Sequence, residues 1–157
     1  ELGHMTVLAD GPICGCGQRG HVEAISSGTA IARYVQEQIN AGQKSTLHPS
    51  RHPHLTTVQI ADAALKGDAL ANSAFERAGY YLGIAVTNYL AIFDPSIVVF
   101  GGGVSQVGDL LFKPFEESLC KHVFHPHYLD DLVITKAALG DDAGLLGALA
   151  LVGMKAK

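Results

Sequence analysis

A run of four apolar residues, followed at once by three glycines, is the feature that most constrains the fold of this chain. Ile97–Phe100 reads Ile-Val-Val-Phe, with Asp94-Pro95 before it to stop a helix and Gly101-Gly102-Gly103 directly after it. A short apolar run rich in β-branched residues is typical of a strand that is covered on both faces, as in a parallel sheet. We therefore expect a sheet with helices packed against it.

The rest of the chain alternates between strand and helix patterns. We predict further strands over Leu2–Leu8 and Leu132–Thr135. Apolar residues at three- and four-residue spacing predict helices over Glu23–Ile39, Thr57–Lys66, Asp109–Val123 and Ala143–Met154, the last one capped by Asp142. In the second of these helices we expect Val58, Ala61 and Leu65 to face inward. Strands that alternate with helices predict an α/β fold with a short parallel or mixed sheet.

The longest predicted helix begins after Asp68, which can cap it, and ends near Phe93. Its apolar stripe is expected to consist of Phe75, Ala78, Leu82, Val86 and Tyr89. Gly79 and Gly83 lie one turn apart in this helix, where glycine lowers helix stability. We expect them to let another backbone approach closely.

Composition excludes several classes of protein. At 157 residues and 48% hydrophobic, the chain has the size of one globular domain. A net charge of -4 with 17% charged residues argues against a nucleic-acid surface, which needs clustered lysine and arginine. No apolar run approaches the roughly 20 residues of a membrane span. Three cysteines, two of them in Cys-Gly-Cys, favour metal binding in a reducing, cytoplasmic compartment over a disulfide framework.

The N-terminal segment carries a candidate metal site. His4, Cys14, Cys16 and His21 are separated by ten, two and five residues, and the glycines of residues 11–21 allow a tight loop. Thiolate and imidazole are the ligands that tetrahedral Zn²⁺ prefers, and four of them leave no open position for water. Two alternatives remain at this point: two buried cysteines with incidental histidines, or Gly3-His4-Met5 left over from a cloning tag.

The other histidines and the third cysteine are expected to be unrelated to this site. Cys120 is predicted to be a buried helix residue. Solvated positions in loops or at a helix end are expected for six histidines: His48, His52, His54, His122, His125 and His127.

The segments ELGH and ICGCGQRGHVE resemble the signature of the ROK family of bacterial sugar kinases and sugar-responsive repressors. That signature reads Glu-x-Gly-His, then Cys-x-Cys-Gly ten residues on, then Gly-Cys-x-Glu. The matching positions are Glu1, Gly3, His4, Cys14, Cys16, Gly17, Gly20 and Glu23, whereas His21 replaces the usual third cysteine. Imidazole can replace thiolate on zinc, so the resemblance implies a two-cysteine, two-histidine zinc site and argues against the tag.

The resemblance also implies roles for individual residues. Glu1, His4 and Glu23 match the positions that contact sugar hydroxyls, with zinc as a structural ion that fixes this wall of the pocket. Taken without the family, Glu23 is an ordinary acidic residue in a first helical turn. The run Gly101–Gly103 matches the ROK stretch on the nucleotide side, and its free N–H groups would suit the phosphates of Mg-ATP. GDDAGLLGALAL resembles the closing helix of the family.

The resemblance covers residues 1–157 and implies the C-terminal half of an actin-like, ribonuclease H-like sugar kinase fold. Two ROK kinase motifs have no match: the Asp-x-Gly phosphate loop and the Asn-Asp pair whose aspartate deprotonates the sugar 6-hydroxyl. GDA at Gly67 and GDD at Gly140 lie in helical or terminal contexts and are not candidates. We therefore expect the catalytic aspartate upstream of Glu1, and no sugar phosphorylation by this chain alone.

Two functional interpretations follow from the resemblance. The favoured one is a kinase that transfers the γ-phosphate of ATP to the 6-hydroxyl of a hexose, with glucose as the favoured sugar and a dimer or tetramer as the assembly. The alternative is a repressor with an N-terminal helix-turn-helix that uses the same fold to bind an inducer; only then is nucleic acid a partner. The intact run Gly101–Gly103 favours the kinase. A third interpretation is a dimerisation or scaffold domain that is stabilised by zinc and binds no ligand.

Overall fold

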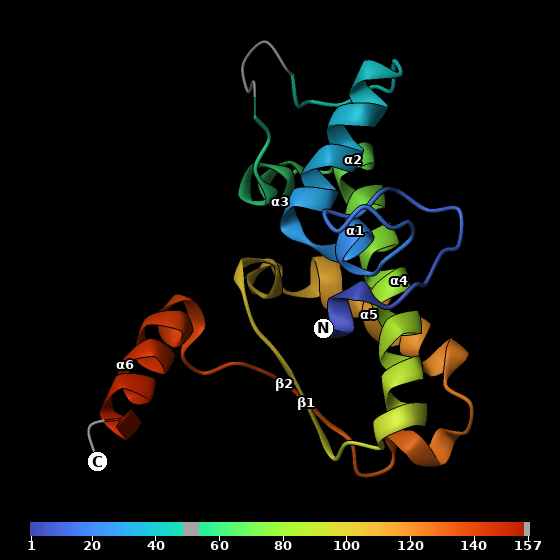
Figure 1. Ribbon diagram of the computed structural model, residues 1–157. Helices are drawn as coiled ribbons and strands as arrows, with labels where there is room; N and C mark the ends of the chain where they lie inside the picture. Colours follow the sequence, from blue (N-terminus) through green and yellow to red (C-terminus); the bar gives the residue numbers. More distant parts are fainter. Residues whose placement is uncertain (49–53, 156–157) are drawn as a thin grey trace.

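The computed structural model describes residues 1–48 and 54–155 (Figure 1). Four α-helices come first, and two short strands then alternate with the last two α-helices. The α-helices are α1 (Glu23–Ser26), α2 (Gly28–Asn40), α3 (Thr57–Leu65), α4 (Ala69–Phe93), α5 (Asp109–His122) and α6 (Ala143–Lys155). The strands are β1 (Ile97–Phe100) and β2 (Val133–Lys136), and 3-10 turns lie at Leu2–His4, Gly103–Val107, Pro126–Leu129 and Gly140–Asp142. The predicted helix-rich α/β pattern is confirmed.

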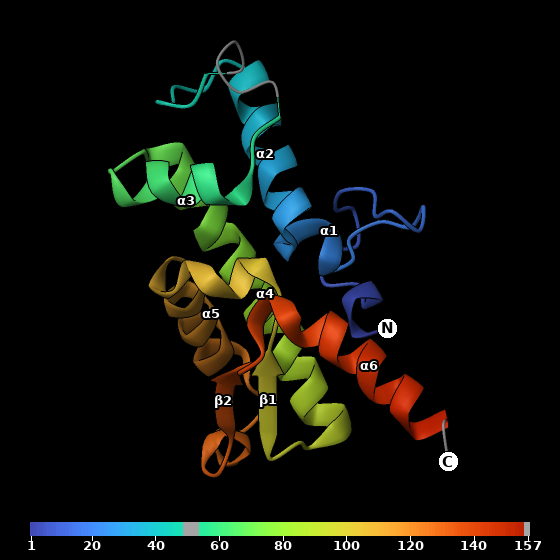
Figure 2. The same ribbon diagram turned by 90° about the vertical axis from the view of Figure 1, so that its left-hand side faces the viewer.

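The two strands pair in parallel, which is one of the two predicted arrangements, with Ile97 opposite Val133 and Phe100 opposite Lys136. Figure 2 shows β1 and β2 side by side. On one face, Val98, Phe100 and Ile134 pack against the buried residues of α4 and α5. On the other face, Ile97, Val99 and Val133 are exposed. The expectation that β1 is covered on both faces is therefore wrong for this chain: helices of the described residues cover only one face.

Helix α4 is the centre of the core. Buried residues of α2 and α3 pack on its first half, around Phe75, and α5 packs on its second half, around Phe115. The predicted stripe is present: Phe75, Ala78 and Val86 are buried, and Leu82 and Tyr89 are half-buried. Asp94, in the left-handed region at φ 45°, ends the helix before Pro95.

Gly79 and Gly83 place α4 directly against α5. A Cβ built on Gly79 would lie 2.7 Å from the Leu111 carbonyl oxygen, and one on Gly83 would lie 2.5 Å from the Ser118 Cβ. Real Cβ atoms do not come this close to other heavy atoms, so the contact requires glycine at both positions. The prediction that another backbone approaches here is confirmed. The partner is α5. It runs in the same direction as α4, because Gly79 meets residues 111–115 and Gly83, one turn later, meets residues 118 and 119.

The N-terminal half differs from the prediction in two places. Leu2–Leu8 is not a strand: it begins with the 3-10 turn Leu2–His4 and pairs with the loop only through an isolated bridge between Thr6 and His21. The predicted helix over Glu23–Ile39 is broken at Ser27, which has an extended backbone. The Ser27 side chain accepts a hydrogen bond from the Ala30 N–H and caps α2, which is why a new helix starts there.

Helix α3 is confirmed, but its inward face is rotated from the predicted one. Val58 and Leu65 are 77% and 76% exposed, whereas Ile60, Ala63 and Ala64 are buried, and Ala61 is partly buried. Thr56 and Gln59 form a capping box that fixes the start of the helix. The small alanines face the core because they allow α3 to pack closely on α4.

The C-terminal helix is confirmed and lies apart from the other helices (Figure 1). Leu145, Leu149, Leu151 and Val152 are exposed on it. None of the helices in the described part of the chain is long and apolar enough to cross a membrane. The Asp142 cap stays a prediction. Cys120 is exposed on α5, so its predicted burial is wrong.

Asp68 caps α4 as predicted and also holds the preceding loop. One carboxylate oxygen accepts the Ala71 N–H at 2.9 Å, and the other accepts the hydroxyls of Ser45 and Thr46 at 2.9 and 2.8 Å. Burial by itself raises the pKa of this carboxyl, but the hydrogen bonds from Ala71, Thr46 and Ser45 lower it, and the net pKa lies below the usual value. The charged form is therefore the stabilising one.

Replacing Asp68 with asparagine should lower the free energy of unfolding at pH 7 by about 1–2 kcal/mol, because the charge is lost from these hydrogen bonds. A carboxyl whose folded pKa is lowered stabilises the fold above its unfolded value of about 3.9, and this stability is lost as the pH falls through the folded pKa. Urea midpoints of the wild type and Asp68→Asn should therefore converge below pH 4. Asp62→Asn, on an exposed carboxyl paired with Lys66, is the control and should change little.

Candidate metal and sugar site

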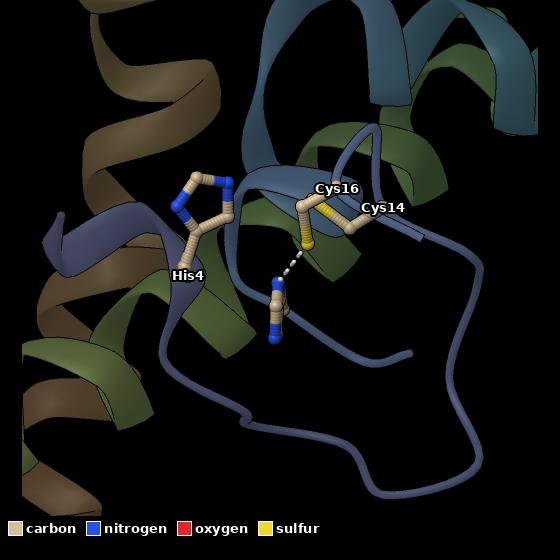
Figure 3. Close-up of side chains that lie close together, drawn as sticks. His4, Cys14 and Cys16 are labelled. Carbon is tan, nitrogen blue, oxygen red and sulfur yellow. Dashed lines mark hydrogen bonds between the residues drawn. The ribbon is translucent and has the colours of Figure 1, made fainter. Parts of the chain in front are cut away.

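The four predicted metal ligands come together in the N-terminal segment, and Figure 3 labels three of them, His4, Cys14 and Cys16. One ligand atom from each of His4, Cys14, Cys16 and His21 lies within 4.8 Å of all the others. The Cys16 Sγ lies 3.3 Å from the His21 Nδ1, and the rings of His4 and His21 meet edge to face at 5.3 Å. Within the described ranges this is the one group of such residues with metal-binding geometry.

Glycines and backbone hydrogen bonds fold the loop around this cluster. The Gly17 N–H donates to the Cys14 carbonyl at 2.9 Å, and the Cys14 N–H donates to the Gln18 carbonyl at 2.8 Å. Gly20 has a positive φ of 72°, and a Cβ there would lie 1.6 Å from the Leu8 carbonyl oxygen. No other residue fits at Gly20, which sits next to His21. The loop geometry therefore depends on the glycines that separate the ligands in sequence.

The donor set fits a tetrahedral metal ion. Two thiols and two imidazoles are the ligands of structural zinc sites, where bonds of about 2.0–2.3 Å place neighbouring ligand atoms roughly 3.3–3.8 Å apart. The 4.8 Å spread of the cluster needs only a small contraction to reach these distances. Cys14 is 4% exposed and His21 is buried, so two of the four ligands are already shielded from water.

Two carboxylates lie against the His4 imidazole. The His4 Nδ1 is 2.9 Å from the Glu1 carboxylate, and the His4 Nε2 is 3.5 Å from the Glu23 carboxylate. Glu1 and Glu23 are both exposed, so their remaining acceptor positions face solvent. The structure thus brings the three predicted sugar-contacting residues together.

Tyr89 anchors the segment that carries Glu1 and His4. Its hydroxyl, on α4, donates to the Leu2 carbonyl at 2.6 Å, and burial raises the pKa of this phenol above its usual value. From the sequence, Tyr89 is predicted only as a member of the apolar stripe of the helix. No local signal could have found its second role, because Leu2 is 87 residues away.

The predicted nucleotide glycines form the turn between β1 and the 3-10 turn Gly103–Val107. Gly102 has a positive φ of 87°, which favours glycine. Gly103 and Val104 line a cavity of about 850 Å³. Residues of α2, of the start of α3 and of the segment before α3 form the other walls, among them Gly28, Arg33 and Thr57. Of the three glycines, Gly103 is the one that reaches this cavity.

The remaining histidines do not join the metal cluster. His48, His54, His125 and His127 are exposed, as predicted, and His52 lies outside the described residues. His122 is half-buried at the end of α5, where its Nδ1 lies 2.8 Å from the Ser118 carbonyl oxygen. Its Nε2 also lies 3.4 Å from the Tyr80 hydroxyl of α4, and the two rings meet edge to face at 5.3 Å. His122 therefore joins α5 to α4 and is not the solvated residue that was predicted.

The sequence model of the ROK family matches residues 1–155. The chain belongs to the ROK family. A glucokinase from Thermotoga maritima is 36% identical over 154 residues, which are 97% of this chain and 48% of that protein. The DNA-binding transcriptional repressor Mlc of Escherichia coli is 28% identical over 148 residues, which are 94% of this chain and 36% of that protein.

Solved ROK structures share the fold. A ROK family glucokinase from Streptomyces griseus, solved in complex with glucose and AMPPNP, superposes with a TM-score of 0.77 at 31% sequence identity. The match covers 96% of this chain and 50% of that chain. This ROK chain therefore spans about half the length of the glucokinases that it matches.

Proposed function

We propose that this chain belongs to a ROK sugar kinase that transfers the γ-phosphate of ATP to the 6-hydroxyl of a hexose, with glucose as the favoured substrate. The observation that carries the proposal is the placement of Glu1, His4 and Glu23 on one open surface beside the metal cluster. Two carboxylates with free acceptor positions are suited to hold sugar hydroxyls. The 36% identity to a glucokinase supports the kinase over the 28% identity to the repressor.

His4 is proposed to bind the metal ion and also to contact the sugar. Each of its ring nitrogens lies near a carboxylate. If one nitrogen binds Zn²⁺, the carboxylate beside that nitrogen is released, and the other nitrogen keeps a fixed direction. Bound zinc, held by His4 and three loop residues (Cys14, Cys16, His21), would supply structural rigidity and no activated water. The released glutamate is then free to accept a sugar hydroxyl.

The nucleotide is proposed to lie on the side of Gly101–Gly103, with the cavity beside Gly103 as part of its site. Residues 1–157 would form the C-terminal lobe, and the catalytic aspartate would come from the part of the protein that this sequence does not include. Phosphoryl transfer from Mg-ATP would then depend on positioning and charge neutralisation between two lobes. A homo-oligomer is part of the proposal, as is a cytoplasmic location, where free thiols persist.

The alternative function is a sugar-sensing ROK repressor. The similarity to Mlc supports it, because both classes share this half of the fold. In a repressor the same carboxylates would bind an inducer, and an N-terminal winged helix would bind DNA. The glycine run would then have no nucleotide to hold.

The full-length protein tests this proposal directly. We expect ATP-dependent glucose phosphorylation in a coupled assay, and no activity from residues 1–157 alone. An Asp-x-Gly motif and an Asn-Asp pair upstream of Glu1 should accompany that activity. A full-length protein that binds DNA in a sugar-dependent way and shows no phosphorylation would instead establish the repressor. Turnover by residues 1–157 alone would contradict the proposed division between two lobes.

A further inference from the structure

We propose that Arg33 is a positioning residue. It holds the loop of residues 11–21, which we call the metal loop, and helix α1 in one fixed arrangement. Its guanidinium lies between the two segments and donates hydrogen bonds to both: Nη1–H to the Ile13 carbonyl at 3.2 Å, and Nη2–H to the Ala24 carbonyl at 2.8 Å. This inference rests on the proposed function, because it assigns a role at the same metal and sugar site.

The two acceptors sit next to functional residues. Ile13 directly precedes the metal ligand Cys14, and Ala24 directly follows the carboxylate residue Glu23. A single side chain of α2 therefore fixes the backbone beside a metal ligand and beside a sugar carboxylate. The guanidinium group suits this task because it presents several N–H donors in a rigid plane, so it can reach two acceptors at once. A lysine ammonium group carries all its N–H donors on one nitrogen atom.

Helix α1 needs such anchors because it is short. Four residues, Glu23–Ser26, cannot form a stable helix by propensity alone. One anchor is the Ser26 hydroxyl, which donates to the Ala78 carbonyl of α4 at 2.8 Å. Arg33 provides a second anchor at the end that carries Glu23. The direction in which Glu23 points toward His4 thus depends on the Arg33 hydrogen bond.

The metal loop makes most of its hydrogen bonds within itself. The Arg19 guanidinium donates to the Gly11 carbonyl inside the loop, and the bridge between Ile13 and Arg19 is also internal. Arg33 reaches the loop from α2 instead and connects it to the helical body. Arg33 also lines the cavity beside Gly103, so the anchor lies between the two proposed ligand sites.

The ion pair with Glu37 is a separate contact. The Arg33 Nε lies 3.8 Å from the Glu37 carboxylate one turn away on α2, and both side chains are partly exposed. Exposed pairs at this spacing contribute little to stability. Glu37→Gln therefore provides a control that removes the pair and keeps both hydrogen bonds to the loop and α1.

Four variants of the chain test the inference: Arg33→Met, Arg33→Lys, Glu37→Gln and Arg77→Met. The last is matched to the first, because Arg77 is also a helix arginine but contacts Tyr34 and Tyr81 instead of the loop. The first measurement is the rate at which Zn²⁺ passes to a chromogenic chelator, together with the visible spectrum of the Co²⁺-loaded chain. The second is hydrogen exchange of residues 11–26, which needs no metal.

We expect Arg33→Met to release Zn²⁺ about tenfold faster than the wild type, since two hydrogen bonds from a charged donor are lost. The Co²⁺ spectrum should change, and residues 11–26 should exchange faster while α5 does not. Arg33→Lys should recover part of the effect, and both control variants should match the wild type.

Three outcomes would overturn the inference. The first is that Arg33→Met and the wild type have the same rate of zinc release and the same Co²⁺ spectrum. The second is that hydrogen exchange of residues 11–26 is unchanged in Arg33→Met. The third is that Arg77→Met releases zinc as fast as Arg33→Met does. A wild-type chain that binds no metal would instead count against the metal site of the proposed function. In that case the exchange measurement still decides whether Arg33 holds the two segments.

Discussion

Replacing Cys14 with serine should reduce the zinc content of the purified chain from about one ion to near zero. A structural zinc site divides a binding free energy of about 10–16 kcal/mol among four ligands, so loss of one thiolate should weaken binding at least a hundredfold. Serine keeps the size of the side chain but does not ionise near neutral pH. Cys14 is also 4% exposed, which leaves little room for water as a substitute ligand. Elemental analysis after dialysis against a chelator measures the effect.

Three further variants make this result specific to the cluster. Cys120→Ser should keep full zinc content, because Cys120 is exposed on α5 outside the cluster. His21→Ala should lower the zinc content, whereas His21→Cys, which restores the usual family pattern, should retain it. Equal zinc in Cys14→Ser and the wild type would show that the four residues do not form the site. Zinc lost equally from Cys120→Ser would point to binding elsewhere.

The parts of the fold that sequence could predict are those with local signals at their ends. Asp68 at the start of α4 and Asp94-Pro95 after it defined that helix, and the apolar run before the glycines defined β1. The candidate metal cluster was predictable because spacing and a family motif pointed to the same four positions, with His21 in place of the usual cysteine, and the structure brings their ligand atoms within 4.8 Å of one another. The close approach at Gly79 and Gly83 followed from their one-turn spacing.

The features that the sequence does not predict depend on contacts between residues that lie far apart in the chain. The pattern of α3 contains so many small apolar residues that it fits several inward faces, and only packing on α4 selects Ile60, Ala63 and Ala64. The segment Leu2–Leu8, predicted as a strand, has no neighbouring strand among the residues that the structure describes, and its backbone partners are loop residues such as Gly20 and Val22. The contacts of Tyr89 and Arg33 join segments far apart in the sequence, so no periodicity reports them.

Replacing Gly79 with alanine should lower the free energy of unfolding by about 2 kcal/mol. The new Cβ would lie 2.7 Å from the Leu111 carbonyl oxygen and 2.9 Å from the Phe115 amide nitrogen. These are backbone atoms of α5 and cannot rotate away, so the helices must separate, at a cost of up to about 3 kcal/mol. Alanine recovers up to about 1 kcal/mol of helix propensity, which offsets part of this cost. The urea midpoint measures the net change.

Gly147→Ala is the matched control, because Gly147 is also a helix glycine but has nothing within 4 Å of the position of a Cβ. It should leave the urea midpoint unchanged or raise it slightly. A Gly79→Ala chain that unfolds at the wild-type urea concentration would contradict the close contact of α4 with α5. Because α4 also carries Tyr89, which holds the Leu2 carbonyl, a shift of this helix should also loosen the segment that bears Glu1 and His4. Zinc release from Gly79→Ala should therefore be faster than from Gly147→Ala, which links the packing of the core to the geometry of the site.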